Sequence, residues 1–187
     1  HTIDDANLIF VDETGFNLHA SKNYGYSPIN QKAVRHVPAN KGRNVSLLCV
    51  VDIHGIKAYK IIDGAYNATL FSEFITQNLR PSLSHTNYTI VMDNAKFHHS
   101  RTVLDTITEC GLSYRFLPPY SPQLNPIEQV FSSIKARYNS DQEIPSNNTV
   151  LKEKLERTLF GYDDNLSNFY REMRRWLMNA LARNIFI

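Results

Sequence analysis

The run Leu8-Ile9-Phe10-Val11-Asp12 is four apolar residues followed by a carboxylate. A second run, Tyr88-Thr89-Ile90-Val91-Met92, is closed in the same way by Asp93. Short apolar runs bounded by polar residues are typical of buried central strands. Ligands of open α/β sheets collect at the carboxyl ends of such strands. The two runs therefore predict two central strands, with Asp12 and Asp93 at a binding edge of the sheet.

The remaining elements fit one α/β domain. Further strands are predicted at 44–51, 57–62 and 113–117, with a hairpin turn at 52–55 between the first two. Apolar spacing predicts helices at 67–79, ended by Pro81, at 98–110, and from near Pro126 to 138. This order resembles the ribonuclease H-like fold, a mixed five-stranded sheet flanked by helices. In that plan the first and fourth strands lie side by side, which would bring Asp12 and Asp93 together.

A third acid, Glu128, closes the Pro-rich stretch 118–128 and falls in the first turn of the helix that begins near Pro126. A helix crossing the sheet could carry it to the first two acids. Each acid also has a simpler interpretation. Asp12 or Asp93 could begin a turn or cap a helix, and Glu128 could complete a capping box in which Asn125 is the N-cap. The coincidence of all three acids with this strand order favours a shared site.

The chemistry of such a site follows from its ligand atoms. Mg²⁺ and similar hard ions prefer oxygen ligands and usually bind through a few carboxylates and substrate phosphates. Two such ions, ~3.5–4 Å apart, can support both the attacking and the leaving oxygen of an in-line displacement. The sequence has no G-x-x-x-x-G-K-[ST] phosphate loop, which argues against a nucleotide-triphosphate enzyme. Metal-dependent phosphoryl transfer is the reaction class that remains.

Three blocks of the sequence, 11–16, 92–98 and 117–128, resemble the catalytic blocks of DDE transposases of the mariner-like superfamily, which includes related bacterial insertion-sequence enzymes. The 34 residues between Asp93 and Glu128 also resemble the spacing in members that end in Glu. The resemblance covers about 8–138. It implies a catalytic role for Asp12, Asp93 and Glu128, which would bind two Mg²⁺ or Mn²⁺ ions per active site.

The same resemblance implies cut-and-paste transposition and DNA integration. Hydrolysis would free the element ends, and a 3′-hydroxyl would then attack target DNA, commonly at TA. The implied partners are transposon ends, target DNA and a second copy of the chain. The expected location is the nucleus in a eukaryote, or the cytoplasm and nucleoid in a bacterium. Two alternatives stay open: a domesticated, non-catalytic DNA-binding module, and a ribonuclease H-like nuclease without strand transfer.

Polar residues near the three acids are candidates for supporting roles. Asn94 and His98 are predicted to support the metal ligands by hydrogen bonding, although a helix-start Asn and a packed His are equally consistent with the sequence. Glu13, Asp52 and Asp63 are interpreted as turn or surface acids. Glu13 should point away from Asp12, because side chains alternate along a strand.

Positive charge gathers in one part of the chain. From Thr14 to Val51 there is no acid, and such a stretch can neutralise phosphates. A solvated loop that merely lacks acids is the alternative. We predict DNA contacts by basic residues in this stretch and on the later helix: Lys22, Lys32, Arg35, Lys41, Arg43 and Lys135.

Length and composition, with 42% hydrophobic residues, indicate one domain over the 187 residues. The resemblance implies that it is a catalytic domain, with a core at about 8–140 and C-terminal helices at about 149–185. The longest apolar run, Leu47–Val51, is far shorter than the ~20 residues that span a bilayer, so no membrane partner is expected. Relatives carry an N-terminal helix-turn-helix region, which we expect to be absent from this chain. The fragment alone should then bind DNA weakly and with little sequence preference.

Overall fold

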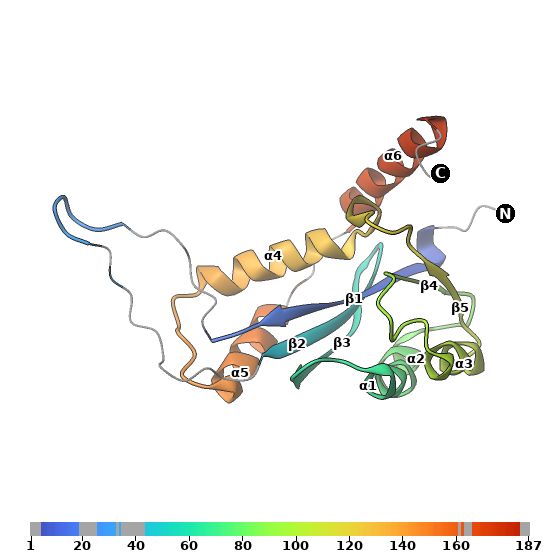
Figure 1. The fold of residues 1–187 in the computed structure, drawn as a ribbon, viewed down its shortest axis with the longest axis horizontal. Coiled ribbons are helices and arrows are strands. Elements are labelled where there is room, and N and C mark those ends of the chain that lie inside the picture. The colour runs from blue at the N-terminus through green and yellow to red at the C-terminus, as the bar shows by residue number, and fades with distance from the viewer. Residues whose placement is uncertain are drawn as a thin grey trace.

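The computed structural model describes residues 5–18, 26–32, 34, 44–160, 162 and 166–183. At its centre lies a five-stranded mixed sheet with the strand order β3-β2-β1-β4-β5 (Figure 1). Its strands are β1 (Leu8–Phe16), β2 (Val45–Asp52), β3 (Gly55–Asp63), β4 (Thr89–Met92) and β5 (Ser113–Phe116). β1 runs antiparallel to β2 and parallel to β4. The first and fourth strands are therefore neighbours, as predicted.

β1 is longer than its apolar run. Its pairing with β4 ends at Phe10 and Val91, but its pairing with β2 continues to Phe16 and Val45. The prediction that Asp12 closes the strand is therefore wrong. The strand continues because β2 offers hydrogen-bonding partners beyond the point where β4 has ended. Asp12 lies in the interior of β1, level with the end of its neighbour.

Two apolar layers cover the two faces of the sheet. One face packs against α4 (Ile127–Ser140), α5 (Asn148–Leu159) and the start of α6 (Ser167–Arg183). The other face packs against α1 (Ala68–Phe74), the π-helical turn at Ile75–Leu79 and α3 (Arg101–Glu109). Successive β1 residues alternate between the layers, with Phe10 in the first and Val11 in the second. This alternation decides which way Asp12 and Glu13 point.

Two predicted helix boundaries are corrected by the structure. The helix after β3 does not end before Pro81, because the π-helical turn is followed by one more turn, α2 (Arg80–Ser82), in which Pro81 lies. Pro81 fits there because proline is tolerated in the first turn of a helix. α3 begins at Arg101 instead of near His98, since Ser100 is extended and its hydroxyl caps Val103 N at 3.4 Å. His98 consequently lies in a turn between β4 and α3.

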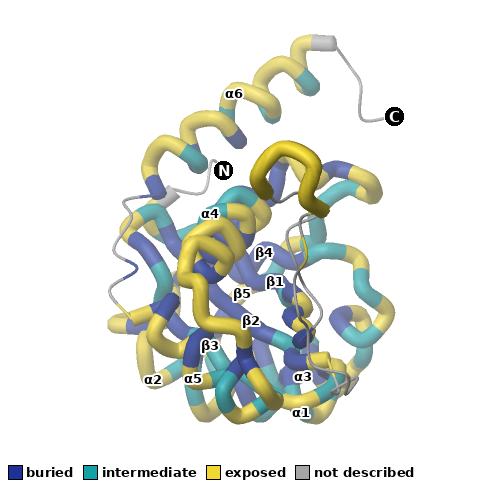
Figure 2. Tube along the Cα trace, turned by 90° about the vertical axis from the view of Figure 1, so that its left-hand side faces the viewer, coloured by how far each residue is buried: buried dark blue, intermediate teal, exposed yellow. Residues whose placement is uncertain are grey.

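α6 is buried in its first half only. Tyr170 and Met173 are buried, whereas Trp176, Met178 and Leu181 are at least half exposed. The second half of α6 projects from the body of the domain (Figures 1 and 2). Within the described residues, no helix is both long and apolar enough to cross a membrane.

Candidate active site

Asp12 and Asp93 stand at the same level of two adjacent parallel strands. The register pairs Phe10 with Val91, and each carboxylate follows two residues later. Asp12 is 9% exposed, whereas the side chain of Asp93 is 47% exposed. The predicted juxtaposition of the two acids is present in the structure, with one acid inside the protein and the other at its surface.

Asp12 is held by Asn125, which precedes α4. The Asn125 amide Nδ2 donates to Asp12 Oδ2 at 2.8 Å, and the backbone N–H of Glu13 donates to Asp12 Oδ1 at 2.7 Å. Burial raises the pKa of Asp12 to about 7. The Glu13 N–H opposes this rise, and the negative charges of Glu13, Asp93 and Glu128 add to it. Asp12 is thus a carboxylate that ionises reluctantly unless a cation is nearby.

The contact between Asn125 and Asp12 also removes the capping-box interpretation of Glu128. Pro126, and not Asn125, is the N-cap of α4, and no side chain caps this helix end. Glu128 lies in the first turn, as predicted, and is exposed. Within the described residues its carboxylate makes no hydrogen bond. It is therefore available to a ligand in the same pocket as Asp12.

Asp93 is held by His98, which packs in the α1 and α3 layer on the other face of the sheet from α4. Its Oδ1 accepts from the backbone N–H of Ala95 at 2.9 Å and lies 2.8 Å from Nδ1 of the fully buried His98. The other ring nitrogen of His98, Nε2, lies 3.3 Å from Glu13 Oε1. His98 is therefore both packed and hydrogen-bonded, and its support of a metal ligand stays a prediction.

The pKa of Asp93 is shifted in the opposite direction to that of Asp12. The His98 contact lowers the pKa of Asp93, against the effect of partial burial. Burial lowers the pKa of His98, but its hydrogen bonds to Asp93 and Glu13 outweigh burial and raise that pKa to about 9. Asp93 is consequently an ionised carboxylate at neutral pH even without a cation.

The other acids and Asn94 make contacts outside the cluster of Asp12, Asp93 and Glu128. Glu13 points away from Asp12, as predicted, but it is not a surface acid, since its side chain is 19% exposed and contacts His98. Asp52 is a turn acid that accepts from the backbone of the β2–β3 hairpin and pairs with Lys57 at 2.8 Å. Asp63 pairs with Lys152 at the surface. Asn94 donates to the Leu117 carbonyl at 2.6 Å, which joins the loops after β4 and β5.

A pocket of about 450 Å³ brings the three predicted acids together. Its floor and walls come from β1, the loops after β4 and β5, and the start of α4. Tyr120 on its rim is fully exposed and has a positive φ of 56°. The lining comprises Asp12, Asp93, Asn94, Ala95, Leu117, Pro118, Pro119, Tyr120, Ser121, Pro122, Asn125 and Glu128.

The pocket suits a hard cation that is also held by a substrate. Its side-chain donors are carboxylate and amide oxygens, which are the ligands that Mg²⁺ and Mn²⁺ prefer. The buried Asn125 Oδ1 has no hydrogen-bond partner among the described residues. Within that part of the chain no three His, Cys, Asp or Glu side chains close around one point. The donors therefore fit a divalent ion whose remaining ligands are substrate oxygens.

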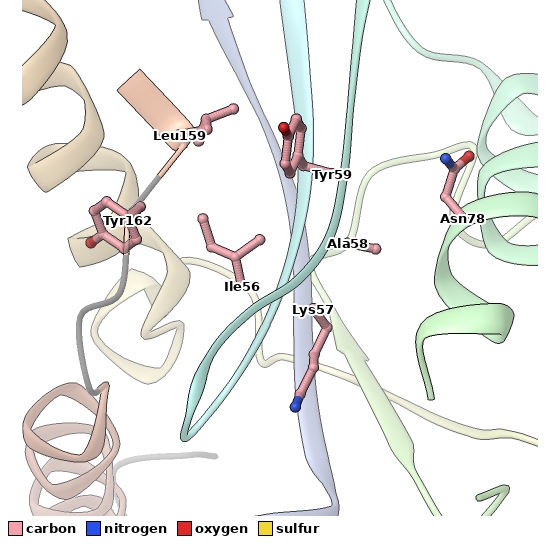
Figure 3. Close-up of a pocket in the computed structure, with 7 residues that line it drawn as sticks. All are labelled: Ile56, Lys57, Ala58, Tyr59, Asn78, Leu159 and Tyr162. Carbon is pink, nitrogen blue, oxygen red and sulfur yellow. The ribbon is translucent and has the colours of Figure 1, made fainter. Parts of the chain in front are cut away.

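A second pocket, of about 300 Å³, lies at the β3 edge of the sheet (Figure 3). Residues of β3, Asn78, the end of α5 and Tyr162 line it, and no carboxylate is among them: Ile56, Lys57, Ala58, Tyr59, Asn78, Leu159 and Tyr162. It offers no ligand set for a hard cation. The acid-lined pocket is therefore the candidate active site.

The predicted DNA-contacting residues are only partly described. Lys32 and Lys135 are exposed, and the Lys135 ammonium lies 6.0 Å from the centroid of the Phe16 ring. Lys22, Arg35, Lys41 and Arg43 lie outside the described residues. Their contact with DNA stays a prediction.

Two positioning contacts were missed by sequence reasoning. Local pattern interprets Asn125 as a helix cap, although its place three residues before Glu128 in the third block is a signal for a role in the site. The sequence interprets Glu13 as a turn or surface acid whose side chain points away from Asp12. The sequence contained a signal for this contact, because the loop after the fourth strand carries His98 and follows a strand that neighbours β1.

Comparison with known proteins places the fold. The sequence model described as DDE superfamily endonuclease matches residues 7–151. No curated protein matches the sequence. The Mos1 mariner paired end complex with Mn has a TM-score of 0.72 at 20% identity, covering 92% of this chain and 53% of that chain. The Mos1 Strand Transfer Complex has a TM-score of 0.65 at 20% identity, covering 91% and 51%.

The catalytic domain of Mos1 mariner transposase, solved alone, has a TM-score of 0.62 at 16% identity and covers 91% of this chain and 77% of that chain. This chain spans about half the length of the Mos1 chains in the two complexes. The likeness confirms the ribonuclease H-like fold. The family match takes in all five strands, the acid-lined pocket and α4, and on that ground the chain belongs to the DDE superfamily of endonucleases.

Proposed function

We propose that this chain is the catalytic domain of a transposase, which cuts DNA at transposon ends and joins those ends to target DNA with the help of divalent metal ions. One observation carries the proposal: Asp12, Asp93 and Glu128, from β1, the end of β4 and the first turn of α4, line one pocket. Membership of the DDE endonuclease family supports the same reaction class. The Mos1 paired-end and strand-transfer complexes supply the precedent for both steps.

Asp12, Asp93 and Glu128 would hold the metal ions, and the working complex would contain two of them, Mg²⁺ or Mn²⁺. When bound, such ions stabilise charge on the phosphate and activate the attacking oxygen. The protein contributes orientation. Asn125 fixes Asp12 and His98 fixes Asp93, so both carboxylates are held before DNA arrives. Glu128 remains exposed at the pocket, where DNA would complete the site.

The partners in this proposal are transposon ends, target DNA with TA sites, and a second copy of the chain that pairs the ends. The exposed Lys32 and Lys135 would neutralise phosphates, together with the basic residues outside the described part of the chain. The protein would act where its DNA is, in the nucleus of a eukaryote or the nucleoid of a bacterium.

A plasmid assay tests cleavage. Supercoiled DNA is incubated with the domain and Mn²⁺ or Mg²⁺, and nicked product is measured for the wild type and for Asp93→Asn. We expect metal-dependent nicking by the wild type and none by the variant, with unchanged circular dichroism. Equal nicking by both proteins would refute the assignment of the site.

A second assay separates transposition from the two alternatives. An oligonucleotide with a free 3′-hydroxyl end is offered with a target plasmid, and covalent joining is measured. Joining supports a transposase, whereas nicking without joining indicates a nuclease. DNA binding without either activity indicates a domesticated DNA-binding module.

A further inference from the structure

His98 is a fully buried imidazole between two carboxylates from different strands. Its Nδ1 contacts Asp93 at the end of β4, and its Nε2 contacts Glu13 on β1. The Phe71 and Phe97 rings pack on it, with centroids 4.7 and 4.3 Å from that of His98. The ring is therefore fixed by packing on its sides and by a carboxylate at each nitrogen.

The contact restricts Asp93 to one orientation. Its Oδ1 is engaged both by the Ala95 N–H and by His98, so the carboxylate cannot rotate without losing both partners. Its Oδ2 is then the oxygen available to a ligand in the pocket. A neighbour that fixes a metal-binding side chain in this manner typically changes metal affinity or activity by about 10–100-fold.

Glu13 reaches this arrangement because it follows Asp12 on β1. Successive strand residues point to opposite faces, so Asp12 faces the pocket and Glu13 faces the α1 and α3 layer, where His98 lies. β1 thereby supplies Asp12 to the pocket directly and, through the contact of Glu13 with His98, fixes Asp93.

We propose that Glu13 is a positioning residue of the metal site, which holds Asp93 in its binding orientation through the His98 ring. This inference rests on the proposed function, because it assumes that Asp93 binds the metal ion. Glu13 itself is not proposed to touch the ion. Its contribution is the oxygen that accepts from His98 Nε2.

Two substitutions separate the effect of the length of the Glu13 side chain from the effect of its charge. Glu13→Gln keeps an acceptor oxygen at the same distance but removes the charge. Glu13→Asp keeps the charge but shortens the side chain, so that the 3.3 Å contact with His98 is lost. A positioning role predicts that Glu13→Gln resembles the wild type, whereas Glu13→Asp and Glu13→Ala are impaired. Asp105→Asn, on the exposed surface of α3, is the control for a lost negative charge.

The measurement is Mn²⁺ affinity by calorimetry on the 187-residue domain, with the fold of each variant checked by circular dichroism. We expect Kd to rise about 10–100-fold for Glu13→Ala and Glu13→Asp. Glu13→Gln and Asp105→Asn should stay within about threefold of the wild type. In the plasmid assay, extra Mn²⁺ should restore the rate of Glu13→Asp, because the defect lies in holding the ion and not in the chemical step.

Asp93→Asn distinguishes failure of this inference from failure of the proposed function. If the wild type binds Mn²⁺ and Asp93→Asn does not, the metal site is established, and wild-type affinity in Glu13→Asp and Glu13→Ala would then overturn the role of Glu13. Weak binding by Glu13→Gln beside normal binding by Glu13→Asp would also overturn it, because charge instead of the hydrogen bond would then be responsible. Should Glu13→Ala fail to fold, the Gln and Asp pair still decides the question.

Discussion

Asp12 and Asp93 stand level on neighbouring strands, yet the protein surrounds them in opposite ways. Asp12 is buried beneath α4, and its pKa is raised to about 7. Asp93 is half-exposed, and its pKa is lowered by contact with His98. The structure therefore makes one acid depend on a cation for its charge, while the other acid carries its charge beforehand.

This difference indicates a division of work within the pocket. Asp93, charged and oriented, can attract a divalent ion from solution. Asp12 loses its proton at little cost only once that ion is near, since ions lower the pKa of adjacent carboxylates. A site arranged in this way avoids three unneutralised negative charges in a small space when no metal is bound.

The largest expected effect is on cleavage, where the two acids should behave alike. Asp12→Asn and Asp93→Asn each remove a proposed metal ligand. Metal ions supply several kcal/mol of transition-state stabilisation, and each 1.36 kcal/mol is tenfold in rate. We expect nicking rates to fall about 10³-fold or more in both variants, measured with saturating Mn²⁺. A rate within tenfold of the wild type for either variant would exclude that acid from the metal site.

The stability of the metal-free protein should separate the two acids. The pKa of Asp12 is raised on folding from 3.8 to about 7, so its contribution to stability is present below pH 4 and is lost as the pH rises through 7. At pH 8, Asp12→Asn should therefore stabilise the protein by about 1–3 kcal/mol, below the limit set by about 1.4 kcal/mol per pKa unit.

Asp93→Asn should do the reverse. The lowered pKa of Asp93 contributes stability above the pKa of this group in the unfolded chain. That contribution is lost as the pH falls through its pKa in the folded protein. Removing that carboxylate also leaves the buried His98 with a weaker partner, at a cost of about 1–3 kcal/mol. Urea unfolding at pH 8 without metal measures both variants, and a shift of the same sign in both would contradict the comparison.

Metal binding should depend on pH through Asp12. Below pH 7 a proton competes with the ion for this carboxylate, so the Kd for Mn²⁺ should rise by up to about tenfold between pH 7 and pH 6 and change little above pH 8. Asp93, with its lowered pKa, should not titrate in this range. Calorimetry in two buffers with different ionisation enthalpies would detect proton release near pH 7. Binding without proton release would show that Asp12 is already ionised.

The smallest effect is expected for Asn125, which orients Asp12 through one hydrogen bond. Asn125→Ala should weaken Mn²⁺ binding by about tenfold, the lower end of the range for residues that orient a ligand. Asn125→Gln is the matched variant, because it keeps the amide but displaces it. Unchanged Mn²⁺ affinity in Asn125→Ala would show that burial alone fixes Asp12.

The sequence predicted the framework of this site, but not the contacts that Asn125 makes with Asp12 and Glu13 makes with His98. The apolar runs before Asp12 and Asp93 indicated two central strands, and the strand order then required the acids to be neighbours. The Asn125–Asp12 and Glu13–His98 contacts join residues that are distant in the chain. The local pattern predicted Asn125 as the N-cap of α4. In the structure its amide instead donates to the buried carboxylate of Asp12.

Element ends show the same limit. Pro81 predicted a helix end, but the π-helical turn before it let the chain continue for another turn. The sequence predicts a helix from His98, but Ser100 caps that helix and Arg101 begins it, which leaves His98 in the turn where it can reach Asp93. Turn and cap geometry depends on such competing hydrogen bonds, which periodicity does not report.

The most direct test of a shared metal site is a calorimetric titration of Mn²⁺, with and without a short DNA duplex, into the wild type, Asp12→Asn, Asp93→Asn and Glu128→Gln. We predict that the wild type binds Mn²⁺ and that each substitution weakens or abolishes binding, while circular dichroism shows the same fold in all four proteins. Equal affinity in all four proteins, or no binding by the folded wild type even with DNA present, would contradict a metal site built from these three acids.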